Sequence, residues 1–107
     1  MLKFVKIGQQ TPPKRNVGTR KEDFKEIYNE FINRKAQEQS SRCSQCGVPF
    51  CQIHCPLSNN IPDWLKLTAE GRLKEAYELS QSTNNMPEVC GRICPQDRLC
   101  EGNCVIE

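Results

Sequence analysis

Several features are scarce or absent in this 107-residue sequence, which has one histidine, one tryptophan and only 36% hydrophobic residues. No apolar run approaches the roughly 20 residues of a membrane-spanning helix. Lysines interrupt the apolar residues at positions 1–8, which excludes a secretory signal peptide there. We therefore expect a cytoplasmic protein with no membrane partner. A chain this short and polar buries a small core, so it needs a covalent or metal staple.

A strong charge of one sign is also missing, because the formal net charge is only +2. Residues 1–42 carry ten Lys/Arg against five Asp/Glu, whereas residues 43–107 carry five against eight. The basic N-terminal region has neither a charge run nor interleaved aromatic residues, so we expect no nucleic-acid partner. It is either a solvated segment or one that lies against the cysteine-rich region or an acidic partner surface.

The pattern outside the cysteines predicts a mainly α fold. Residues 1–19 contain Gly8, Pro12-Pro13 and Gly18 and are expected to form an extended tail, with a helical domain over 20–107. A helix is predicted from Thr19 or Lys21 to about Gln37, because one apolar stripe recurs at helical spacing. This stripe, which should cover the cysteine-rich region, consists of Phe24, Ile27, Tyr28, Phe31 and Ile32.

A helical hairpin is predicted between the two groups of cysteines. Asn59-Asn60 should cap its first helix, with Pro62 in the first turn and Gly71 as the residue that ends it. The second helix should run over 72–81, with Leu73, Ala76, Tyr77 and Ser80 on one face. Pro87 and Glu88 then open a short turn into Cys90, and no segment alternates like a strand. Glu107 follows without a terminating signal, as at a cut inside a longer protein.

Cysteine is the abundant residue, with eight copies, all between positions 43 and 104. The first four read C-x2-C-x4-C-x3-C-P and the last four read C-x3-C-P-x4-C-x3-C. In a reducing cytoplasm such clusters bind metal more often than they form disulfides. Structural zinc sites prefer two C-x2-C pairs, or one pair with two histidines, whereas this chain has one pair and only His54. Zinc stays an alternative, in which the domain is a structural module.

The first group follows the order of the bacterial ferredoxin run C-x2-C-x2-C-x3-C-P, with a longer second gap. In that run the cysteine before proline ligates the other cluster. By analogy, Cys43, Cys46 and Cys51 hold cluster one with a remote fourth ligand, and Cys55 reaches cluster two. In the simpler, local arrangement, each group of four cysteines holds its own cluster, and spacing alone leaves both arrangements open. Either way, two [4Fe–4S] clusters are predicted.

Three stretches carry a resemblance to a known family: C-S-Q-C-G-V-P-F-C-Q-I-H-C-P-L (43–57), N-N-I-P-D-W (59–64) and P-E-V-C-G-R-I-C-P-Q-D-R-L-C-E-G-N-C-V (87–105). They resemble the N-terminal iron–sulfur domain of the small (beta) subunit of NADPH-dependent glutamate synthase, which is similar to the N-terminal part of dihydropyrimidine dehydrogenase. The resemblance covers essentially the whole chain and implies a small α-helical, ferredoxin-like domain with cysteine-rich loops.

The resemblance also implies a ligand set that is crossed between the two groups. Cluster one would be held by Cys43, Cys46, Cys51 and Cys104, and cluster two by Cys55, Cys94 and Cys100. The fourth ligand of cluster two would be a side chain other than cysteine, beyond Glu107. Cys90 is then a spare buried thiol, which we favour, or it completes cluster two in this chain. Backbone amides at Gly47, Gly91 and Gly102 are candidate donors to sulfur, unless these glycines only permit tight turns.

The implied function is electron transfer within an oxidoreductase. In that family FAD and NADPH bind to C-terminal flavin domains that this chain lacks, and electrons pass on to the large (alpha) subunit, where glutamine and 2-oxoglutarate become glutamate. No G-x-G-x-x-G fingerprint occurs in this chain, so it should not be catalytic by itself. The alternative within the same fold is a related FAD/NAD(P)H iron–sulfur oxidoreductase.

Overall fold

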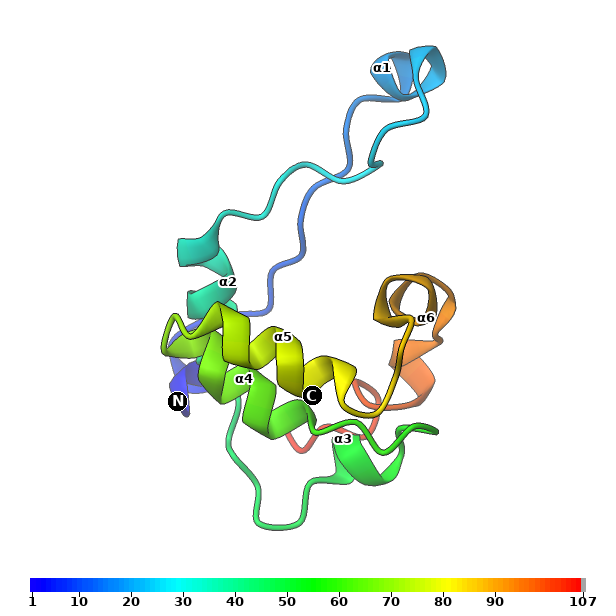
Figure 1. Cartoon of the computed structure of the whole chain (residues 1–107). Helices are drawn as coiled ribbons and strands as arrows, with labels where there is room; N and C mark the ends of the chain where they lie inside the picture. Colours follow the sequence, from blue (N-terminus) through cyan, green and yellow to red (C-terminus); the bar gives the residue numbers. More distant parts are fainter. Residues whose placement is uncertain (107) are drawn as a thin grey trace.

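The computed structural model describes residues 1–106, and in these residues it is built from helices and loops (Figure 1). No strand is formed in this part of the chain, apart from one isolated antiparallel bridge between Lys14 and Tyr28. The mainly α prediction is therefore confirmed, whereas Glu107 lies outside the described residues. The elements in order are the 3-10 turn η1 (Lys3–Val5), α1 (Val17–Glu22), α2 (Asn33–Ser40), α3 (Phe50–Ile53), α4 (Ile61–Ala69), α5 (Leu73–Gln81), α6 (Pro87–Ile93) and the 3-10 turn η2 (Gln96–Arg98).

The predicted hairpin between the cysteine groups is confirmed as α4 and α5, which pack against each other, with α2 packed against α4. Gly71 joins them at φ 78, a left-handed conformation that glycine adopts without steric cost. The four predicted residues of α5 line one shallow groove together with Trp64 and Thr68 of α4. Among these four, only Ala76 is buried, at 6% exposure. The hydrophobic core is consequently small, as the composition predicts.

The two asparagines before α4 do not act as predicted, because neither side chain caps the helix. Asn59 instead joins the two helices: its Oδ1 accepts the indole N–H of Trp64 at 2.8 Å, and its Nδ2 donates to Ser80 O and Thr83 Oγ1, both at 2.8 Å. Asn60 accepts a hydrogen bond from Gln52. The side chains are used across the hairpin because the backbone at Asn60 (ψ 58) departs from the extended N-cap geometry.

Replacing Asn59 with alanine should therefore destabilise the hairpin. The change leaves the partly buried Trp64 N–H without its acceptor, and it removes two donated bonds to α5 and the following loop. We expect the free energy of unfolding to fall by about 2–3 kcal/mol. Urea unfolding followed by tryptophan fluorescence measures this directly, since Trp64 is the only tryptophan. Asn85→Ala, in the exposed part of the same loop, is the matched control, and an equal loss in both variants would contradict the assignment.

The long helix predicted from Thr19 or Lys21 to Gln37 is wrong. The structure has α1 and α2 at its two ends and an irregular chain over 23–32 between them. The aromatic stripe does not cover the cysteines, since Phe24 is fully exposed and Ile27 and Ile32 are 46% and 59% exposed. Figure 1 shows the reason at the level of the fold: residues 12–32, which we call the arm, run out from the helices and return, with α1 at the tip.

Local hydrogen bonds explain why the helix breaks at Asp23. Its carboxylate accepts the Lys25 N–H at 2.9 Å and pairs with the Arg15 guanidinium at 2.8 Å, and these contacts hold the pKa of Asp23 down to about 2. A side chain that bonds its own backbone two residues on competes with helix formation. Backbone hydrogen bonds from Arg15 N to Ile27 O and from Asn29 N to Pro13 O then join the two sides of the arm.

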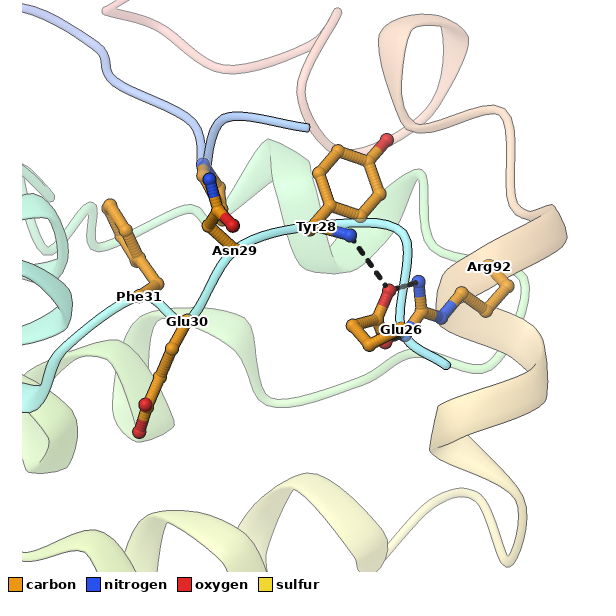
Figure 2. Close-up of a pocket in the computed structure, with 7 residues that line it drawn as sticks. Glu26, Tyr28, Asn29, Glu30, Phe31 and Arg92 are labelled. Atoms are coloured by element: carbon orange, nitrogen blue, oxygen red, sulfur yellow. Dashed lines mark hydrogen bonds and ion pairs between the residues drawn. The ribbon is translucent and has the colours of Figure 1, made fainter. Parts of the chain in front are cut away.

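The arm also contacts α6, next to the second cysteine group. The carboxylate of Glu26 accepts two bonds from the Arg92 guanidinium and one from the backbone N–H of Tyr28, and Figure 2 shows these groups around a pocket. The pairing with Arg92 lowers the pKa of Glu26 to about 2. Both side chains are at least half exposed, so solvent weakens this ion pair and it orients the arm more than it stabilises the fold.

The first residues of the chain lie against the segment that leads into the cysteines. Leu2 N donates to Cys43 O at 2.9 Å and Lys3 N donates to Ser41 O at 3.0 Å. Ser40 and Ser41 at the end of α2 are buried at this contact, at 7% and 5% exposure. The N-terminal residues thus fix the backbone where the first cysteine group begins. The division between a tail over 1–19 and a domain over 20–107 stays a prediction.

Candidate iron–sulfur site

Six of the eight cysteines lie in turns or loops, as the sequence predicts, whereas Cys51 and Cys90 lie within short helices. Cys43 and Cys46 precede α3, Cys51 lies within it, and Cys55 lies two residues after its end. The second group is carried by α6 and the turns that follow it, which makes α6 a seven-residue helix where only a short turn was predicted. All eight side chains are free thiols of intermediate exposure: Cys43, Cys46, Cys51, Cys55, Cys90, Cys94, Cys100 and Cys104.

The fold mixes the two cysteine groups. Burial raises the pKa of the Cys51 thiol, and the neighbouring thiolates of Cys104, Cys43 and Cys100 raise it further. Cys51 belongs to the first group, yet the cysteine that raises its pKa most is Cys104, the last cysteine of the second group. Distant parts of the sequence therefore meet at this point.

Cys100 shows the reciprocal mixing. Burial is again the main cause that raises its pKa, and the contributing thiolates are Cys94 of its own group and Cys55 of the first. Within residues 1–106, Cys46 and Cys90 contribute to neither shift. Thiols with raised pKa values are protonated at neutral pH, so binding of iron to them must release protons.

Two polar side chains next to the first cysteines contact sulfur. The backbone N–H and the Nε2 of Gln45 donate to Cys43 Sγ at 3.4 and 3.3 Å, and Ser44 Oγ lies 2.9 Å from Cys46 Sγ. Sequence reasoning missed both residues because it searched for donors among glycines. The only available signal was that both lie inside the C-x2-C pair.

The glycine at position 102 has a different role from the one predicted. Its N–H donates to Gln96 O at 3.3 Å, so it is not a donor to sulfur. A Cβ at this position would lie 2.0 Å from Asp97 O, which means that the turn before Cys104 requires glycine. For Gly102 the tight-turn alternative therefore holds, and the roles of Gly47 and Gly91 as sulfur donors stay predictions.

Residues 20–107 match the family described as dihydropyrimidine dehydrogenase domain II, 4Fe-4S cluster. The chain belongs to this family. The match covers both cysteine groups, the helical hairpin and most of the arm. The protein is therefore a [4Fe–4S] cluster domain, and the resemblance predicted from its motifs is confirmed.

Named relatives within this [4Fe–4S] family extend the comparison. The chain is 71% identical to a glutamate synthase [NADPH] small chain of Azospirillum brasilense over its whole length, and 52% identical to the protein of that name in Escherichia coli over 99% of its length. It is also 49% identical, over 89% of its length, to a putative oxidoreductase AegA of Escherichia coli. The chain spans 22% of the first two relatives and 15% of the third.

The donors present suit the cluster that this dihydropyrimidine dehydrogenase domain II family carries. Thiolates are the ligands of [4Fe–4S] clusters, and half-buried thiols with polar donors at sulfur are what such a cluster needs around it. Within residues 1–106, no three Cys, His, Asp or Glu side chains converge closely enough to hold a single metal ion.

The helices of the same part of the chain are all too short or too polar to cross a membrane.

Proposed function

We propose that this chain is the electron-transfer domain of the small subunit of an NADPH-dependent glutamate synthase. The observation that carries the proposal is the 71% identity over the entire chain to a protein of that name. In this proposal FAD and NADPH bind to C-terminal flavin domains of the longer protein, and the large subunit is the partner that makes glutamate from glutamine and 2-oxoglutarate. Its eight free cysteines agree with a reducing, cytoplasmic location.

Two clusters with crossed ligands form the second part of the proposal. Cys43, Cys46, Cys51 and Cys104 would hold cluster one, and Cys55, Cys94 and Cys100 would hold cluster two. The thiolates that raise the pKa values of Cys51 and Cys100 support this grouping, since most of them belong to the same proposed set. Cys90 is assigned as a spare thiol, and the fourth ligand of cluster two then lies beyond Glu107.

A bound [4Fe–4S] cluster supplies one-electron transfer, and the residues of the chain position it and shield it. The two cysteine groups would hold the clusters, and the α4–α5 hairpin, which separates the groups in the sequence, packs against α3 of the first group. The turn at Gly102 brings Cys104 back to the first group. Such an arrangement suits a relay between the flavin and the large subunit, because both proposed clusters lie in one small domain.

A double substitution in the full-length subunit tests the relay. Cys51→Ser with Cys55→Ser removes one proposed ligand from each cluster but leaves the flavin domains untouched. With the large subunit present, NADPH-dependent glutamate formation should fall to background, whereas NADPH-dependent reduction of ferricyanide should persist because a dye can accept electrons at the flavin. Cys90→Ser is the control and should retain both activities. Glutamate formation that survives the double substitution would refute the relay.

A further inference from the structure

We infer that Gln45 is a positioning residue for cluster one, and that it sets the reduction potential of that cluster through two hydrogen bonds to the sulfur of Cys43. The inference rests on the proposed function, because it takes Cys43 as a ligand of cluster one. It goes beyond that function by assigning a role to a side chain that holds no iron.

The geometry at Gln45 directs two separate donors to one sulfur atom. The backbone N–H lies 3.4 Å and the side-chain Nε2 3.3 Å from Cys43 Sγ. The backbone donor reaches sulfur because Gln45 has φ 53, in the left-handed region that side chains other than glycine and asparagine rarely adopt. An unfavourable conformation at a site contact is retained where the surrounding structure enforces it.

A second hydrogen bond of the same amide holds the side chain in place. Nε2 also donates to Pro62 O at 2.7 Å, and Pro62 is a buried residue in the first turn of α4. An amide nitrogen carries two hydrogens, so it can serve the sulfur and the carbonyl at the same time. The sulfur contact is therefore tied to the α4–α5 hairpin, the best-packed part of the chain.

The physical effect of these donors depends on the charge of the cluster. Reduction adds one electron, so the thiolate sulfurs become more negative and accept hydrogen bonds more strongly. Donors at sulfur thus favour the reduced state and raise the reduction potential. Removing the side-chain donor should lower the potential of cluster one, while cluster two keeps its own.

The substitution Gln45→Leu tests this in the 107-residue chain, reconstituted anaerobically with iron and sulfide. It removes the amide donor with little change in size. We expect the equilibrium constant for one-electron reduction to fall about tenfold, which is about 59 mV. Gln52→Leu is the matched control: Gln52 adjoins Cys51, but its side chain donates to Asn60 and Ser58 O. In this control variant the equilibrium constant for one-electron reduction should stay within about twofold of the wild-type value.

A measurement on the unchanged chain keeps the test decisive even if Gln45→Leu fails to assemble. With glutamine labelled by 15N only at the side-chain amide, the cryoreduced cluster should show a 15N hyperfine coupling in pulsed EPR. A potential unchanged in Gln45→Leu, or a wild-type spectrum without the coupling, would overturn the inference. A purely structural role would lower stability without moving the potential. Wild-type protein that takes up zinc but no sulfide would instead refute the proposed function.

Discussion

Replacing Cys51 and Cys104 together should cost the protein one cluster and not two. The full-length wild-type subunit, which includes the proposed fourth ligand of cluster two beyond Glu107, should hold about eight iron and eight sulfide, and each single serine variant about four of each. If both cysteines ligate the same cluster, the double variant also retains about four, because the second substitution removes a ligand from a cluster that is already lost. The measurement is iron, acid-labile sulfide and zinc content of anaerobically prepared protein.

The reciprocal double variant makes this test specific for the crossed arrangement. Cys51→Ser with Cys55→Ser affects both clusters in the crossed scheme and should leave almost no iron. In the local scheme these cysteines share a cluster, so this pair would keep about four iron while the pair of Cys51 and Cys104 would lose all of it. The two schemes therefore predict opposite results for the two double variants. Cys90→Ser should match wild type, and zinc without sulfide in the wild type would exclude both.

The hairpin, and the loops that carry most of the cysteines, were predictable because they depend on local signals, whereas the helices around Cys51 and Cys90 were not predicted. An apolar helical pattern that stops at a glycine predicts the end of a helix, as at Gly71. Prolines in the first turns of α4 and α6 mark where those helices begin. The position of Cys104 beside Cys51 was reached only through resemblance. The spacing of the cysteines alone left crossed and local ligation open, because a local sequence pattern does not determine which loops meet in space.

The arm shows where a local signal misleads. Its apolar residues recur at helical spacing. However, the contacts of Asp23 with Arg15 and of Glu26 with Arg92 favour an extended chain whose two sides pair with each other. Helical periodicity predicts a helix only if a surface is available to bury the stripe, and here Phe24 has none. Gln45 was missed for a related reason: its left-handed backbone and its bond to Pro62 depend on tertiary structure.

Removing the iron should unfold the two cysteine segments and leave the hairpin. Thiolate-ligated clusters are bound only by the folded loops, so their binding free energy is also folding free energy. Residues 43–57 and 87–104 contain short helices of four and seven residues and have few buried side chains. Without the clusters, their amide hydrogens should exchange about 100-fold faster or more, a change of about 2.7 kcal/mol in local stability.

The α4–α5 hairpin supplies the internal control, because the hydrogen bonds of Asn59 that join its two helices involve no cysteine. Ala76 is buried between its helices, and Asn59 bonds across it without any contribution from sulfur. Hydrogen exchange followed by mass spectrometry should therefore find residues 61–81 similarly protected before and after chelation of iron. The helix predicted over 20–37 cannot take this role, since the arm occupies that region. Equal protection of the cysteine segments in both states would mean that packing, and not the clusters, organises them, which the small core makes physically difficult.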